Sequence, residues 1–102
     1  MEDKLKFYID GKWVDPVRPK TEEVINPANE EPFARISMGS QADVDKAVAA
    51  ARKAFDSFSK TTREERVALL EKIVAVYQKR YGDIVKAISM EMGAPLSRRL
   101  AP

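Results

Sequence analysis

The spacing of the apolar residues changes near residue 40, and this change constrains the fold more than any other feature of the sequence. Before residue 40, short β-prone runs alternate with turn residues. After it, apolar residues recur at steps of three and four from Val44 to Phe58, which is the pattern of one face of an amphipathic helix. The sequence therefore predicts short strands followed by long helices.

The first forty residues are predicted to form two β-hairpins. Asp10 and Gly11 separate the first two runs and suit a type I′ turn, because both of its central residues need positive φ. The second pair of runs is separated by Asn26-Pro27 and a polar loop, and it ends at Gly39. The predicted strands are residues 6–9, 12–14, 23–25 and 33–38.

Capping residues place the starts of two helices. Ser40 with Asp43, and Thr62 with Glu65, have the spacing of a capping box, although Asp43 replaces the usual Glu in the first. The second predicted helix covers close to thirty residues and continues to Met92. Only a short connection separates the two helices, so we expect them to be antiparallel neighbours.

Glycines mark a bend and an end in the second predicted helix. Gly82 interrupts it at a cost of about 1 kcal/mol relative to Ala, which indicates a bend. Gly93 suits the left-handed position after a helix, and Pro95 prevents simple continuation. Two amphipathic helices and four short strands expose more apolar surface than they can bury on each other, so we expect part of it to need a partner surface.

The residue types exclude most catalytic chemistry. The chain has no Cys and no His, which rules out thiol nucleophiles, His bases, zinc fingers and Ser-His-Asp triads. The four glycines match no phosphate-binding spacing, and we expect no glycine turn between a strand and a helix. Ser57 and Lys60 match the S-x-x-K motif of serine β-lactamases, but its partner motifs are absent and a helix end explains the pair better.

The remaining polar and aromatic residues have ordinary structural interpretations. Trp13, the only tryptophan, is expected to pack at a strand end with its N–H bonded. The acidic and basic residues early in the first helix, which include Asp43, are interpreted as a solvated face. We therefore predict no catalytic, cofactor-binding or metal-binding residue in this chain.

Charge and hydropathy exclude two classes of partner. Lys and Arg number 18 and Asp and Glu 16, for a net charge of +2, and the basic pairs at Lys79-Arg80 and Arg98-Arg99 are too few and too far apart for a nucleic-acid surface. No run approaches the ~18 apolar residues of a membrane span, and the N-terminus has no apolar signal-peptide core. We expect a cytoplasmic protein that binds neither nucleic acid nor membrane.

The order of the motifs resembles the start of the NAD(P)-dependent aldehyde dehydrogenase superfamily. Five segments between residues 6 and 97 match the family in the same order, and residues 43–55 match its first helix almost residue for residue. Asn29-Glu30 departs from the family, which has a T-G turn there. The matching segments are residues 7–14, 24–28, 43–55, 63–70 and 91–96.

The resemblance implies an α+β segment of a larger α/β fold, with two hairpins at 6–39, a helical pair at 40–93 and a truncated tail at 94–102. It covers about the N-terminal fifth of the family, whose catalytic cysteine, general-base glutamate and cofactor domain lie further on. An intact member would oxidise an aldehyde to a carboxylic acid with NAD or NADP, whereas this fragment is expected to be inactive and to hold no cofactor. After Ser97 the sequence leaves the family pattern, through either a cut or a frameshift.

Some family members bind a monovalent cation through residues that correspond to Val24, Ile25 and Glu91. The other ligands belong to the missing portion, so the resemblance implies no complete site here. We expect the chain to associate with itself or with the missing remainder of the fold. The alternative is a stand-alone module whose helical pair binds another protein.

Overall fold

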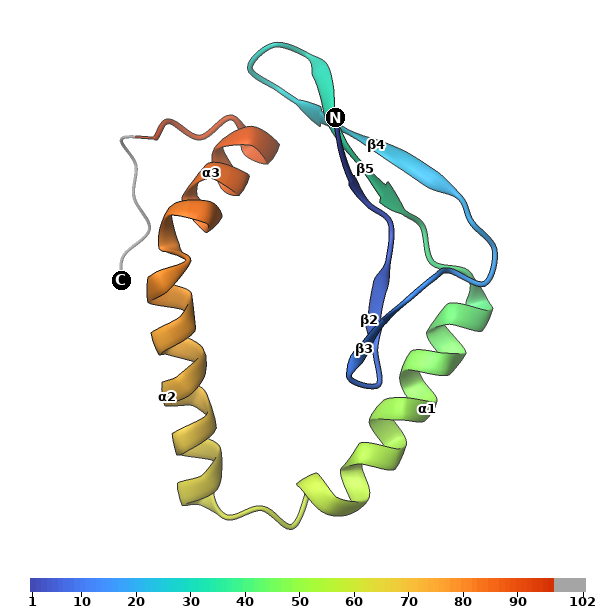
Figure 1. Cartoon of the computed structure of the whole chain (residues 1–102), viewed down its shortest axis with the longest axis vertical. Coiled ribbons are helices and arrows are strands. Elements are labelled where there is room, and N and C mark those ends of the chain that lie inside the picture. The colour runs from blue at the N-terminus through green and yellow to red at the C-terminus, as the bar shows by residue number, and fades with distance from the viewer. Residues whose placement is uncertain (97–102) are drawn as a thin grey trace. The chain divides into compact units, whose positions relative to one another are not determined.

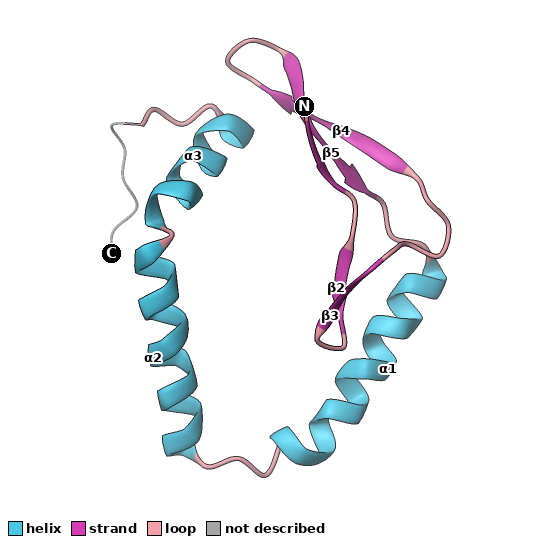
Figure 2. Cartoon of the chain, viewed as in Figure 1, coloured by secondary structure: helices cyan, strands magenta, loops and turns pink. Residues whose placement is uncertain are grey.

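The computed structural model describes residues 1–96, with strands before residue 40 and helices after it (Figures 1 and 2). The predicted change from strands to helices is confirmed. The strands are β1 (Glu2–Lys4), β2 (Phe7–Ile9), β3 (Lys12–Val14), β4 (Thr21–Asn26) and β5 (Glu31–Ser37), and the helices are α1 (Gln41–Phe58), α2 (Arg63–Lys79) and α3 (Tyr81–Met92).

The chain forms two compact units. The first unit consists of residues 1–25 and 32–60, and therefore contains α1 and most of the strands. The second unit joins the turn at residues 26–31 to the chain from Thr61 onward, with α2 and α3. The expected antiparallel arrangement of the first two helices stays a prediction. The tail from Ser97, including Arg98-Arg99, lies outside the described residues.

In the first unit, β2 and β3 form the predicted hairpin. The two strands are antiparallel, with Tyr8 opposite Trp13. Asp10 has a φ of 55° and Gly11 a φ of 77°, so both central residues of the turn are left-handed as the type I′ prediction requires.

The second predicted hairpin is part of a three-stranded sheet with the order β1-β5-β4. We did not predict β1, which pairs in parallel with β5. Arg35 of β5 donates from Nε and Nη2 to the two carboxylate oxygens of Asp3, at 2.9 and 3.0 Å, and this pairing raises the pKa of Arg35. Glu-Asp-Lys carries no alternating apolar pattern, so only contacts made across 32 residues of sequence could reveal this strand.

Both helix starts are capped at the predicted residues, with a complete capping box at α1 and the Thr62 side-chain bond at α2. At α1, the Ser40 Oγ accepts from the Asp43 amide and the Asp43 carboxylate accepts from the Ser40 amide, which completes a capping box. At α2, Thr62 Oγ1 accepts from the amide of Glu65 at 3.1 Å.

The second predicted helix is divided at Arg80, two residues before the glycine that indicated a bend. Arg80 has φ −102° and ψ 13°, and its amide donates to the carbonyls of Val76 and Tyr77 at 3.0 and 3.1 Å. α3 begins directly afterwards and ends at Gly93, whose φ of 75° confirms the predicted left-handed position.

Gly82 lies inside α3, and nothing lies within 4 Å of where its Cβ would be. Gly82→Ala is therefore expected to stabilise the chain by ~0.4–1 kcal/mol, because alanine restricts the unfolded chain without a clash. Urea unfolding followed by helical circular dichroism measures the change. Gly11→Ala is the matched control and should destabilise the chain, because its φ of 77° is left-handed.

Little of the described chain forms a core. Ala34, at 6% exposure, is the one buried apolar residue of residues 1–96, whereas large apolar residues of α1 and α2 are about half exposed. The expected excess of uncovered apolar surface is thus confirmed.

Candidate functional site

The S-x-x-K pair lies at the exposed end of α1. The Ser57 hydroxyl donates to the carbonyl of Ala54 at 3.5 Å, one turn earlier in the same helix. Lys60 follows the C-cap residue Ser59, and its amide donates to the carbonyl of Ser57. Both residues therefore take part in the end of a helix, as the structural interpretation predicts.

The residues that correspond to the family's cation ligands are divided between the two units. Val24 and Ile25 lie in β4 of the first unit, and Glu91 lies exposed in the last turn of α3 in the second unit. Within residues 1–96, no cluster of three or more acidic side chains could hold a metal ion. The cation site stays an implication of the resemblance.

The connection between β5 and α1 contains Gly39, where the predicted strand was expected to end. The start of α1 is nevertheless not arranged as a phosphate site. The Asp43 carboxylate accepts from the amide of Ser40 at 3.0 Å and from its hydroxyl at 2.9 Å. This carboxylate places negative charge at the helix start, which disfavours a second anion there.

Asp43 is buried, at 5% exposure, so its assignment to a solvated helix face is also wrong. Besides capping α1, its Oδ1 accepts from the amide of Val17 at 3.0 Å, across 26 residues of sequence. Hydrogen bonds from the amides of Ser40 and Val17 hold the pKa of Asp43 below its ordinary value. Asp43 thus fixes the connector after β3 to the start of α1.

Asp43→Asn is expected to destabilise the first unit at neutral pH. Its folded-state pKa is lowered, so the ionised carboxylate contributes stability above the unfolded pKa near 4, and this contribution is lost as the pH falls through the folded value. Thermal melts at pH 7 should separate the variant from the parent chain, and melts below pH 3 should not. A gap of equal size at both pH values would contradict this assignment.

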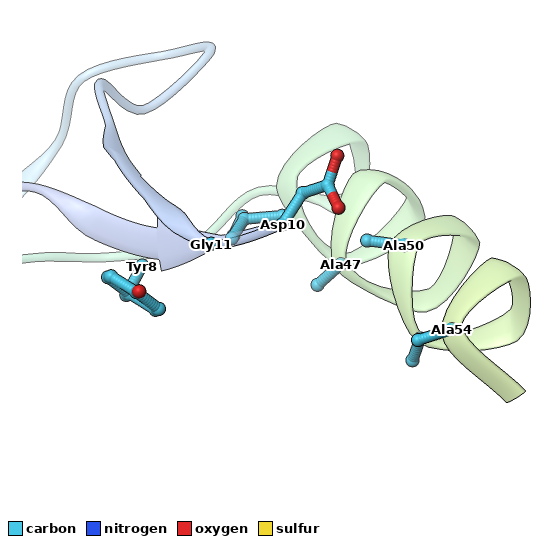
Figure 3. A pocket seen from close by; sticks show the side chains of 8 residues that line it. Tyr8, Asp10, Gly11, Ala47, Ala50 and Ala54 are labelled. Carbon is cyan, nitrogen blue, oxygen red and sulfur yellow. The ribbon is translucent and has the colours of Figure 1, made fainter. Parts of the chain in front are cut away.

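A shallow hollow of about 360 Å³ lies between the β2–β3 hairpin and α1 (Figure 3). One wall is the end of the hairpin, from Tyr8 to Gly11, and the other is a stripe of alanines on α1. Asp10, at the turn, is the one charged residue of its lining. The alanines, which lack bulky side chains, allow the hairpin to lie close to the helix; they are Ala47, Ala50, Ala51 and Ala54.

The single tryptophan is exposed. Trp13 and Tyr8 are 66% and 62% exposed, and their rings meet edge to face with centroids 5.1 Å apart. The predicted packing of Trp13 at a strand end is therefore wrong, because its cross-strand neighbour supports the ring without covering it. Paired, exposed aromatic rings of this kind favour burial against a partner.

An apolar face covers roughly half the circumference of α2, at about 100° per residue. Leu70 and Ile73 lie along its middle and are 60% and 54% exposed, and Val74, nearer one edge, is 53% exposed. The charged residues Glu71 and Lys72 lie on the opposite side. We call this apolar face the α2 face; its members are Val67, Leu69, Leu70, Ile73, Val74 and Val76, and each is at least 45% exposed.

No helix in the described part of the chain combines the length and the apolar run that crossing a membrane requires. Charged residues lie on the other side of α2, and Arg66 lies on the same side as Leu70 and Ile73, one and two turns earlier.

The profile of the aldehyde dehydrogenase family matches residues 13–101. The chain belongs to this family. The resemblance inferred from the five ordered segments is therefore confirmed, and the chain corresponds to an N-terminal segment of the family.

Individual relatives give the same result. The chain is 46% identical over its full length to a 3-succinoylsemialdehyde-pyridine dehydrogenase of Pseudomonas, of which it covers 21%. The crystal structure of an aldehyde dehydrogenase from Bartonella henselae is 50% identical with a TM-score of 0.94, over 95% of this chain and 20% of that one. An aldehyde dehydrogenase of Pseudomonas syringae, solved with NAD+ and octanal, is 48% identical with a TM-score of 0.88, over 90% of this chain and 19% of that one.

The chain thus spans about a fifth of the length of the curated relatives it matches. Its fold is that of the corresponding segment in much longer chains. The candidate functional site is therefore a set of uncovered apolar surfaces, which includes the α2 face.

Proposed function

We propose that this chain is the N-terminal docking segment of an NAD(P)-dependent aldehyde dehydrogenase, whose complete form oxidises an aldehyde to a carboxylic acid. The family match covers most of the chain, whereas the chain covers a fifth of its relatives. The observation that carries the proposal is the α2 face, which a family member of full length has enough additional chain to cover. The segment contributes structure, and the rest of the enzyme contributes the chemistry.

The residues of this chain do not fit NAD. Within residues 1–96, β5 and α1 form the one strand-to-helix connection, and it contains Gly39. Asp43 places negative charge at the start of the helix that follows. Gly11 and Gly93 belong to a hairpin turn and a helix end. NAD binding, aldehyde binding and thiol chemistry are accordingly proposed for the remainder of the enzyme, and calorimetric titration of this chain with NAD or NADP should show no sub-millimolar binding.

Reconstitution tests the docking function. The 102-residue chain is mixed with the Bartonella henselae enzyme from which the corresponding first fifth has been deleted. Capture of the chain in a single complex on size exclusion, together with recovery of NAD-dependent aldehyde oxidation, is the expected result. Failure of the two segments to form a complex contradicts the proposal.

Two charge-matched variants make the test specific for the α2 face. Leu70→Glu places a carboxylate within the α2 face and should weaken capture by roughly tenfold or more, since burying a leucine contributes ~1.5–3 kcal/mol. Ala75→Glu adds the same charge on the opposite side of α2 and should leave capture unchanged. Equal effects of the two variants would show that another surface docks.

The complete enzyme is proposed to be cytoplasmic and to bind neither nucleic acid nor membrane; the near-balanced charge of this segment supports the part of the proposal that concerns nucleic acid. Association of enzyme subunits into an oligomer is part of the same proposal. Cell fractionation and sedimentation of the complete protein test these points.

A further inference from the structure

The turn between β4 and β5 has a closely defined shape. Asn26 Oδ1 accepts from the amide of Ala28 at 2.9 Å, and Asn29 Oδ1 accepts from the amide of Glu31 at 3.0 Å. Glu30 has a left-handed φ of 60°, and its amide donates to the carbonyl of Asn26 at 2.7 Å. These bonds show how the turn forms without the family's T-G pair. The Asn29 side chain accepts the hydrogen bond from the Glu31 amide, and Glu30 takes the left-handed position that glycine would otherwise fill.

This turn lies against the end of α3, within the second unit. A Cβ built on Gly93 would lie 3.1 Å from Cγ and 3.8 Å from Cβ of Pro27. The first distance is shorter than ordinary van der Waals contact, so a side chain at residue 93 would displace the proline. Two independent observations therefore favour glycine at residue 93: its φ of 75° and the close approach of Pro27.

We propose that Gly93 is a positioning residue that seats the Asn26–Glu31 turn on the end of α3, so that the turn and the helix end form one rigid corner. By sequence the turn belongs to the strands on either side of it, and by contact it belongs to the helical unit. The corner couples segments that lie more than sixty residues apart. This inference does not depend on docking to the rest of an enzyme.

Engineered disulfide formation tests the corner directly. The chain has no cysteine of its own, so the double variant Pro27→Cys/Gly93→Cys contains a single possible pair. Pro27→Cys also removes the ring carbon that a Cβ at residue 93 would meet, so the left-handed φ is the one penalty that this pair retains. The Cβ separation of 3.8 Å equals the mean of about 3.8 Å for disulfides. At low protein concentration we expect a monomer with an intramolecular disulfide (a ring-closed monomer). A non-reducing gel and mass spectrometry identify it.

The control is Pro27→Cys/Gly82→Cys, which places the second cysteine near the start of α3 instead of at its end. The two pairs close loops of similar length, so an unordered chain would oxidise both at nearly the same rate. A seated turn should close the Pro27/Gly93 pair roughly tenfold faster or more, because its effective concentration is higher. Equal rates, or disulfide-linked dimers in place of the ring-closed monomer, would overturn the proposal.

A second measurement separates the close approach from the left-handed φ. Gly93→Ala and Gly11→Ala carry the same conformational penalty, but only Gly93→Ala also meets a neighbour. Gly93→Ala should shift the amide resonances of Ala28 and Glu31, and Gly11→Ala should not. Unchanged resonances in Gly93→Ala would show that the turn holds its shape without the corner.

Discussion

At tens of micromolar, the 102-residue chain is expected to sediment as associated species whose mass increases with concentration, and to unfold over a broad range. Chains of this size bury only about 60–65% of their unfolded surface even when complete. In this chain Ala34 is the one buried apolar residue among residues 1–96, and the six residues of the α2 face are each at least 45% exposed. Exposed patches of this kind associate. Sedimentation velocity over a concentration series measures the effect.

Double variants that extend those of the docking test also test this expectation. Leu70→Glu with Ile73→Glu should reduce the apparent association constant by roughly tenfold or more, because each substitution removes part of the ~1.5–3 kcal/mol available from burying a large apolar side chain. Ala68→Glu with Ala75→Glu adds the same charge outside the α2 face. A compact monomer with a sharp, cooperative melt would contradict the prediction and would favour a stand-alone interaction module.

The chain alone is expected to show no aldehyde oxidation with NAD or NADP, for aliphatic and aromatic aldehydes alike. Acyl transfer to an enzyme nucleophile needs a thiolate or an activated hydroxyl, a base for the attacking water, and a bound nicotinamide. The sequence contains no Cys and no His, and Ser57 bonds to the carbonyl of its own helix. Absorbance at the NADH maximum, followed over a series of chain concentrations, measures turnover.

Ser57→Ala distinguishes the two ways in which this expectation could fail. Turnover that scales with chain concentration and survives Ser57→Ala would reveal a site elsewhere in the chain. Turnover that disappears in Ser57→Ala would mean that the S-x-x-K pair at Ser57 and Lys60 is catalytic. Activity in this assay cannot come from reconstitution of the complete enzyme, because the complementary segment is absent.

The candidate site shows where sequence reasoning succeeded and where it could not. The sequence has more apolar helix positions than its short strands can cover, and it therefore predicted uncovered helix faces. The exposed residues of the α2 face confirm this prediction. Asp43 was recognised as a helix cap but not as a buried acceptor for Val17, since nothing in the local sequence places the connector beside it. Trp13 was expected to be packed, and it is 66% exposed because the Tyr8 ring meets it edge to face without covering it.

The sequence by itself determined the features that depend on near neighbours. These are the change from strands to helices, the Asp10-Gly11 turn, the caps at Ser40 and Thr62, and the left-handed end at Gly93, because short-range hydrogen bonds and φ preferences decide them. Tertiary structure alone decided the parallel pairing of β1 with β5, the burial of Asp43 and the contact of Pro27 with Gly93. Each of these depends on segments 26 or more residues apart, whose meeting is set by packing and chain topology rather than by any local pattern.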